Sequence, residues 1–97
     1  MKQLYTAAVT VRGGRDGHAR STDGQLTVPL GFPRELGGNG TGVNPEQLFA
    51  AGFAACFASS IKVAARTLSV AIGEVTVDAA ATLSLRDDGS YLVSAVA

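Results

Sequence analysis

The fold is decided by residues 44–60, Asn44-Pro45-Glu46-Gln47-Leu48-Phe49-Ala50-Ala51-Gly52-Phe53-Ala54-Ala55-Cys56-Phe57-Ala58-Ser59-Ser60. Asn44 is a favourable N-cap and Pro45 suits the first position of a helix. The sequence therefore predicts a helix that begins here and runs to about Leu68. This helix carries Cys56, the only cysteine of the chain.

The predicted helix offers no polar face to water, because no charged side chain occurs from Gln47 to Ile61. A helix that is apolar on all sides is either a membrane span or the centre of a core. The apolar run of residues 48–61 is shorter than the roughly 20 residues that a bilayer requires, and Lys62 and Arg66 follow it. We therefore expect a long buried central helix and no membrane-spanning segment.

Composition indicates one soluble domain over residues 1–97, which should bury roughly 60–65 % of the surface that its unfolded chain exposes. Eight basic and eight acidic residues are scattered without runs. This balance argues against a nucleic-acid interface and against a polybasic membrane anchor. A single cysteine excludes an internal disulfide, and the opening residues do not form a signal peptide. A cytoplasmic location is expected.

The rest of the chain is expected to form strands around the helix. Alternating apolar and polar residues, with Gly-rich or Asp-Gly turns between the segments, predict strands over residues 3–12, 18–22, 26–30, 73–85 and 91–96. The fold class is therefore α+β, with an antiparallel sheet wrapped on the central helix. Residues 31–43 are rich in glycine and are predicted to form a loop. This loop lacks the Lys-Ser/Thr pair of a phosphate loop, so it could shape a pocket rim but is not expected to bind a nucleotide.

Two candidate site residues have simpler explanations. His18 is the only histidine, whereas a metal site requires three or four ligands. We therefore interpret His18 as a surface strand residue and expect no metal. Glu46 is the only acid in the first half of the helix, and a negative charge in the first turn stabilises a helix without any catalytic role.

Cys56 admits two interpretations. Unpaired cysteines are most often inert packing groups in a core. A reactive cysteine instead needs a cation near its thiolate, and Cys56 lies too far from the helix N-terminus for the helix dipole to supply that charge. The arginines that precede the helix are Arg12, Arg15, Arg20 and Arg34. Of these, Arg15 lies in a glycine-flanked turn, and a carboxylate would be needed to hold its guanidinium in place.

Residues 44–57 closely resemble the helix of the organic hydroperoxide resistance (Ohr) proteins, within the OsmC/Ohr superfamily. Other segments resemble the same family in the same order, namely Leu4-Tyr5-Thr6-Ala7, Gly13-Gly14-Arg15-Asp16-Gly17 and Glu35-Leu36-Gly37-Gly38. The resemblance covers nearly the whole chain. It implies an OsmC-like fold that assembles as an intertwined homodimer.

The resemblance also implies an activity. It implies a thiol-dependent peroxidase that reduces organic and fatty-acid hydroperoxides, in which Cys56 attacks the peroxide and forms a sulfenic acid. Arg15 and Glu46 would activate that cysteine. An external dithiol of the lipoyl type would regenerate it, and no bound cofactor, metal, haem or flavin would take part.

The apolar side chains near the cysteine suit such a substrate. Phe49, Phe53 and Phe57 could line a pocket for an alkyl hydroperoxide, although aromatic residues at this spacing are first of all helix-core residues. The alternative is a non-catalytic OsmC-like fragment that acts as a binding or interaction domain, with Cys56 as a core residue.

Helix geometry limits how the implied site can assemble. Ten residues separate Glu46 from Cys56, which corresponds to about 15 Å along the helix and about 80° in direction. Either the helix bends so that Arg15 spans the gap, or a second chain supplies the Arg15–Glu46 pair; we favour a site at a dimer interface. Family members continue past residue 97 with a second, resolving cysteine. The resemblance therefore implies that the family's C-terminal segment is missing from these 97 residues.

Overall fold

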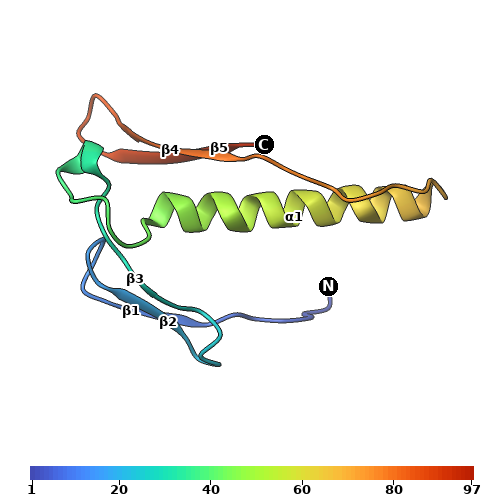
Figure 1. Cartoon of the computed structure of the whole chain (residues 1–97), viewed down its shortest axis with the longest axis horizontal. Helices are drawn as coiled ribbons and strands as arrows, with labels where there is room; N and C mark the ends of the chain where they lie inside the picture. Colours follow the sequence, from blue (N-terminus) through green and yellow to red (C-terminus); the bar gives the residue numbers. More distant parts are fainter. The chain divides into compact units, whose positions relative to one another are not determined.

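The computed structural model describes all residues, 1–97, as two sheets, one long helix and the connections between them (Figure 1). The elements in chain order are β1 (Val9–Arg12), β2 (His18–Ser21), β3 (Thr27–Pro29), a 3-10 helix (Arg34–Leu36), α1 (Pro45–Thr67), β4 (Ala80–Leu85) and β5 (Tyr91–Val96). This content confirms the α+β class. The chain divides into two compact units, Met1–Pro45 and Glu46–Ala97.

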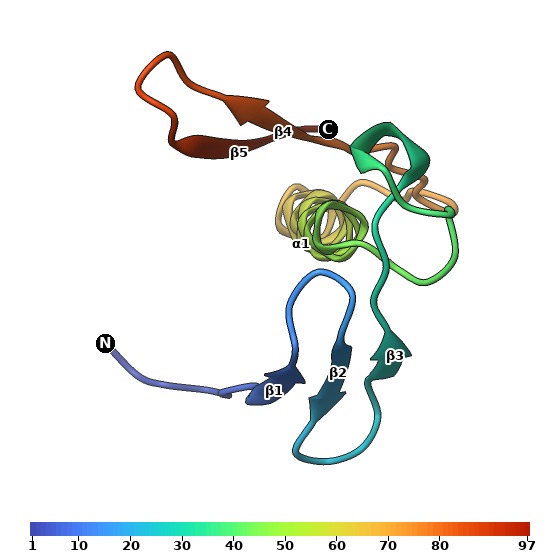
Figure 2. The same ribbon diagram turned by 90° about the vertical axis from the view of Figure 1, so that its left-hand side faces the viewer.

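The first unit contains an antiparallel meander in the order β1-β2-β3, as the sequence predicts (Figure 2). β1 pairs with β2 so that Arg12 lies opposite His18, and β3 pairs with β2 so that Pro29 lies opposite His18. Side chains alternate between the two faces of a sheet. One face therefore carries apolar side chains, including the buried Ala19, and the other carries polar and basic ones.

β1 is shorter than the strand predicted over residues 3–12. Its neighbour β2 ends at Ser21, so residues 1–7 have no strand to pair with and make no backbone hydrogen bond. Leu4 and Tyr5 are exposed, at 86 % and 79 %. The strand prediction is therefore wrong for residues 3–8 of the single chain. An alternating pattern identifies residues that are able to pair, but it does not show that a neighbouring strand is present.

The turn between β1 and β2 consists of Gly13-Gly14-Arg15-Asp16-Gly17. Its last residue, Gly17, packs closely against the backbone of Arg12. The N–H of Leu30 donates to the carbonyl of Gly17 at 2.8 Å, which ties the turn to the residue after β3. A Cβ atom on Gly17 would meet the carbonyl oxygen of Arg12. The path of the backbone at this point therefore requires glycine.

Residues 31–43 form a loop, as predicted, apart from the 3-10 helix. The two ends of the loop meet, because Leu30 and Val43 form an isolated parallel bridge. The N–H of Val43 donates to the carbonyl of Pro29 at 3.0 Å, and the N–H of Gly31 donates to the carbonyl of Val43 at 3.1 Å. The loop is thus closed at its base, two residues before α1 begins.

In the second unit, α1 begins at Pro45, as predicted, and ends at Thr67. A Schellman motif closes the C-terminus: the N–H of Val70 donates to the carbonyl of Ala65 at 2.9 Å, and the N–H of Ser69 donates to that of Arg66 at 3.1 Å. Ser69 has a φ of 55°, the left-handed conformation that glycine usually adopts at this position.

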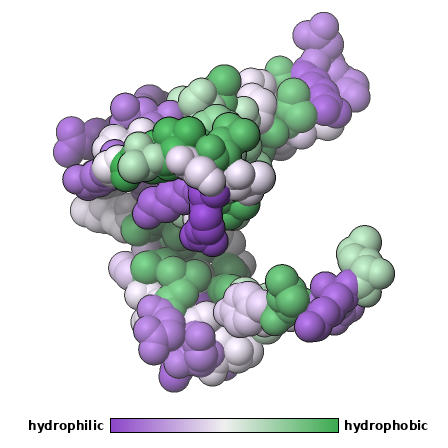
Figure 3. All heavy atoms as spheres, turned by 90° about the vertical axis from the view of Figure 1, so that its right-hand side faces the viewer, coloured by the Kyte–Doolittle hydropathy of each residue, from purple (hydrophilic) through white to green (hydrophobic).

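The prediction that this helix is buried is wrong for the single chain. No residue of α1 is buried, and β4 and β5 pair with each other without close contact to the helix backbone. Figure 3 shows hydrophobic residues exposed on the surface beside hydrophilic ones. With 23 residues, α1 is also long and apolar enough to cross a membrane, by length and composition alone. Core helices of soluble proteins pass the same test, so this finding does not contradict the expectation of no membrane-spanning segment.

The accessible surface of the chain is larger than that of a compact monomer of the same mass. The chain exposes 7620 Å², whereas a compact monomer of the same 9.8 kDa mass exposes about 5200 Å². Folding thus buries about 46 % of the surface of the extended chain, below the predicted range of roughly 60–65 %. No residue of α1 is buried in the single chain, which agrees with this lower value.

β4 and β5 form an antiparallel hairpin, from Ala80 opposite Val96 to Leu85 opposite Tyr91. The strand predicted over residues 73–85 is shortened to β4, because residues 71–79 have no neighbouring strand. The predicted alternation is nevertheless present in the exposure of the side chains. The half-buried residues on one side are Val75, Val77, Ala79, Ala81 and Leu83.

Replacing Gly17 with alanine is expected to lower the free energy of unfolding by about 1–3 kcal/mol, since the added Cβ meets the Arg12 carbonyl. Gly14→Ala is the matched control, because its added Cβ meets no other atom within 4 Å, and it should change that free energy by about 0.5 kcal/mol or less. Urea unfolding followed by circular dichroism measures both variants. Equal destabilisation by the two would contradict the close approach at Gly17.

Two hairpin turns are held by carboxylates that accept hydrogen bonds. Asp88 accepts from the hydroxyl of Ser90 at 2.6 Å and from its N–H at 2.9 Å. Asp23 accepts from the hydroxyl of Ser21 at 2.6 Å and from the N–H of Gln25 at 3.0 Å. In both cases the side-chain bond first, and then the backbone bond, lowers the pKa of the carboxyl below its usual 3.8.

A carboxyl whose pKa is lowered by folding stabilises the protein above its unfolded-state pKa, and this contribution is lost as the pH falls through the folded-state pKa. We therefore expect the free energy of unfolding to decrease as the pH drops below 3.8. Asp23→Asn with Asp88→Asn should flatten this dependence, since the amide oxygen still accepts the same bonds without titrating. Thermal unfolding at a series of pH values from neutral to strongly acidic measures this pH dependence. Asp87→Asn, at an exposed position of the same turn as Asp88, is the control. An unchanged pH dependence in the double variant would refute the assignment.

Candidate functional site

Cys56 lies in the middle of α1 with an exposed, unpaired thiol. The hydroxyl of Ser60, one turn later, donates to the carbonyl of Cys56 at 3.1 Å. In the single chain the thiol is therefore accessible to small reagents.

Glu46 lies in the first turn of α1 and is half-buried. A negative charge is favourable at this end of a helix. The helix is continuous between Glu46 and Cys56, without the bend considered above (Figure 1). The two residues therefore stay about 15 Å apart along the helix, and the structure does not bring them together within one chain.

Arg15 occupies the turn between β1 and β2 and is half-buried. The hydrogen bond from Leu30 to Gly17 and the close packing at Gly17 define the backbone on which it stands. Arg15 belongs to the first unit, whereas Glu46 and Cys56 belong to the second. The three residues predicted to act together are therefore divided between the two units.

Phe49, Phe53 and Phe57 form one stripe along α1, because residues four apart lie on the same side of a helix. Their side chains are 49 %, 37 % and 46 % exposed. Cys56 lies three residues after Phe53 and directly before Phe57, at the edge of the stripe. In the single chain these rings form an exposed apolar surface beside the thiol.

The structure contains no group of three or more His, Cys, Asp or Glu side chains arranged to hold a metal ion. His18 lies on β2 and is exposed, in the place expected for a surface strand residue.

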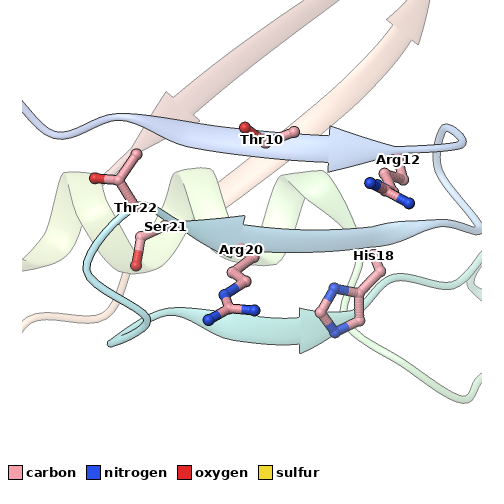
Figure 4. A pocket seen from close by; sticks show the side chains of 6 residues that line it. All are labelled: Thr10, Arg12, His18, Arg20, Ser21 and Thr22. Atoms are coloured by element: carbon pink, nitrogen blue, oxygen red, sulfur yellow. The ribbon is translucent and has the colours of Figure 1, made fainter.

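Sequence reasoning missed a depression on the first sheet, with a volume of about 460 Å³ (Figure 4). It is lined by Thr10, Arg12, His18, Arg20, Ser21 and Thr22. The signal was present as basic residues at alternate positions of two strands that pair with each other. Pairing register, which the sequence alone did not supply, brings them to one face.

A second depression, of about 260 Å³, lies where the glycine-rich loop meets the β1–β2 turn. Its lining includes Asp16 from the turn and Gly38, Asn39 and Thr41 from the loop. The side-chain oxygen of Asn39 accepts from the N–H of Thr41 at 2.9 Å and from its hydroxyl at 2.6 Å, which shapes this part of the loop. The loop does form a pocket rim.

Comparison with known families gives an independent assignment. The family described as OsmC-like protein matches residues 38–95. This range includes the whole of α1 with Cys56 and most of the β4–β5 hairpin.

Individual relatives agree with the family match. The organic hydroperoxide resistance protein of Xanthomonas axonopodis pv. citri (strain 306) is 56 % identical over 79 residues, which cover 79 % of this chain and 56 % of the relative. The organic hydroperoxide resistance protein OhrB of Bacillus subtilis (strain 168) is 39 % identical over 90 residues, which cover 93 % of this chain and 66 % of OhrB. The chain thus spans little more than half the length of the first of these curated relatives.

A solved structure extends the likeness to the fold. The crystal structure of an organic hydroperoxide resistance protein OsmC from Legionella pneumophila has a TM-score of 0.90 and 41 % sequence identity, over 97 % of this chain and 69 % of that protein. The resemblance seen in residues 44–57 is confirmed. The chain belongs to the OsmC-like protein family, and the proteins it is similar to are named for organic hydroperoxide resistance.

Proposed function

We propose that the chain is the peroxide-reactive part of a thiol peroxidase that reduces organic and fatty-acid hydroperoxides to alcohols. The observation that carries the proposal is the exposed thiol of Cys56 within the helix that matches this family. The names of the relatives support an organic hydroperoxide as the substrate class.

The chemical step is a displacement at oxygen. The thiolate of Cys56 attacks the terminal oxygen of the hydroperoxide, so a sulfur–oxygen bond forms as the oxygen–oxygen bond breaks. Sulfur is oxidised to a sulfenic acid, the peroxide is reduced, and the departing alkoxide takes a proton to become the alcohol. Phe49, Phe53 and Phe57 offer the alkyl chain an apolar surface beside the thiol.

Arg15 and Glu46 contribute electrostatic stabilisation and form no covalent bond with the substrate. The guanidinium of Arg15 keeps its positive charge. It stabilises both the thiolate and the negative charge that develops on the peroxide oxygens. The carboxylate of Glu46 orients the planar guanidinium by a charge-assisted pair. Since α1 keeps Glu46 about 15 Å from Cys56, the long arginine side chain must bridge them from another unit or another copy.

Regeneration requires an external reductant, because two electrons are needed to return the sulfenic acid to the thiol. A dithiol of the lipoyl type condenses with the sulfenic acid to give a mixed disulfide and water. Its second thiol then displaces Cys56 and closes a cyclic disulfide. The cycle uses no bound metal, haem or flavin.

We further propose that the protein is a cytoplasmic homodimer in which a second copy covers α1. The surface exposed in excess of a compact monomer is about 2400 Å² per chain. Two chains could therefore bury about 4800 Å², within the range of obligate homodimer interfaces. Neither a nucleic acid nor a membrane is a proposed partner, because the net charge is zero and a covered α1 has no apolar face left for lipid.

Reaction of the reduced protein with one equivalent of cumene hydroperoxide should add one oxygen atom to Cys56, and hydrogen peroxide should react more slowly. Intact mass spectrometry with dimedone trapping of the sulfenic acid measures both rates. Arg15→Ala should slow the reaction about 100-fold or more, the effect expected for removing a donor that stabilises a developing oxyanion. Arg86→Ala, at an exposed arginine in the β4–β5 turn, should leave the rate unchanged.

The peroxidase proposal fails if the folded protein keeps an unmodified thiol, or if Arg15→Ala and Arg86→Ala react equally fast. An unmodified thiol would favour the alternative, a non-catalytic binding domain. Cys56→Ser gives the background oxidation of the rest of the chain.

Sedimentation equilibrium should give a mass of twice 9.8 kDa for the single chain. Phe53→Glu places a charge on the apolar stripe of α1 and should shift the equilibrium toward monomer. Thr82→Glu, at an exposed position of β4, is the matched control and should remain dimeric. A monomer at all concentrations, or equal dissociation of both variants, would exclude the second copy as the cover of α1.

A further inference from the structure

The basic face is the side of the first sheet that carries Thr10, Arg12, His18 and Arg20. Thr10 lies opposite Arg20 and Arg12 lies opposite His18 in the β1–β2 ladder. Opposite residues project on the same side of a sheet with Cβ atoms about 5 Å apart. The two arginines and the histidine are therefore neighbours, and all belong to the first unit (Figure 4).

The basic side chains of this face have no acidic partner within the chain. The side chains of Arg12, His18 and Arg20 are exposed and form neither a hydrogen bond nor an ion pair. The nearest acids along the chain, Asp16 and Asp23, lie in the turns at the two ends of β2. One carboxylate oxygen of Asp23 is already bound by Ser21 and Gln25.

This concentration of charge is not explained by composition, because the chain as a whole has no net charge. Arg12 and Arg20 lie diagonally across the β1–β2 ladder, opposite His18 and Thr10 respectively. A partner that brings carboxylates could pair with both guanidinium groups. The hydroxyl groups of Thr10 and Thr22 line the same depression and can donate further hydrogen bonds.

The shape of the site selects the kind of partner. The depression is shallow and none of its side chains is buried, so a single small anion would remain largely hydrated. A chain of several carboxylates gains from many weak contacts at once. Nucleic acid binding requires a larger cluster of lysine and arginine than this face offers.

We propose that the basic face docks an acidic segment of a partner protein, with Asp or Glu side chains over Arg12, His18 and Arg20. An extended segment presents every second side chain on one side, which suits carboxylates at alternate positions. The proposal does not depend on the peroxidase activity, since none of these three residues belongs to the catalytic set.

Binding of a fluorescein-labelled peptide of alternating Glu and Ser tests the proposal by fluorescence anisotropy, with a Gln-Ser peptide as the neutral probe. The Glu-Ser peptide should bind and the Gln-Ser peptide should not. Arg12→Gln and Arg20→Gln should each weaken binding about three- to fivefold, as expected for exposed charge pairs, and the double variant by about tenfold. Added salt should weaken binding of the unmodified protein.

The control is the double variant Lys62→Gln with Arg86→Gln, which removes the same charge from exposed positions elsewhere in the chain. It should leave peptide binding within about twofold of the original. Amide chemical shifts in β1 and β2 should respond to the Glu-Ser peptide and not to inorganic phosphate. The proposal is overturned if the Glu-Ser peptide does not bind, if the control weakens binding as much as Arg12→Gln with Arg20→Gln, or if phosphate or a DNA oligonucleotide binds this face more tightly.

Discussion

The structure depends on one constraint, the need to cover α1. A helix with no charged side chain from Gln47 to Ile61 gains little from water on any side. Within the single chain, β4 and β5 pair with each other in a hairpin, and no residue of α1 is fully buried. Residues 1–7 and 71–79 also lack a partner in the single chain, because neither segment has a neighbouring strand with which to pair.

The same constraint governs the chemistry. Cys56 lies beside the exposed rings of Phe53 and Phe57, so whatever covers α1 also determines which molecules reach the thiol. A polar residue at Phe49 or Phe53 would be easier to solvate but would remove the apolar surface beside the sulfur. The catalytic proposal and the dimer proposal are linked for this reason: closing the apolar surface also shields the thiol and brings other groups toward it.

The first unit meets a different requirement, which is to hold Arg15 in place. The close approach at Gly17 and the bond from Leu30 fix the turn that carries it. The residues that fix the turn come from both ends of the meander, so the position of Arg15 depends on β3 as well as on its own neighbours. The basic face lies on β1 and β2, and two of its residues, Arg12 and His18, directly flank that turn.

Much of the local structure was predictable from particular residues. Pro45 marked the start of α1, Asp23-Gly24 marked a turn, and Val75, Val77 and Ala79 revealed the half-buried side of their segment. The lengths of β1 and β4 were not predictable, because a strand ends where its partner ends. The basic face was missed because it arises from the register between β1 and β2.

The sequence by itself determined the helix, the order of the strands, the faces of each strand and the family, because these follow from local propensity and from motifs within short segments. Tertiary structure decided which residues have neighbours. It showed that no residue of α1 is buried in the single chain and that Glu46 and Cys56 lie apart on one unbroken helix. It also showed that Arg12, His18 and Arg20 share a surface. Burial and strand pairing each require two segments in contact, whereas a local sequence pattern describes only one segment.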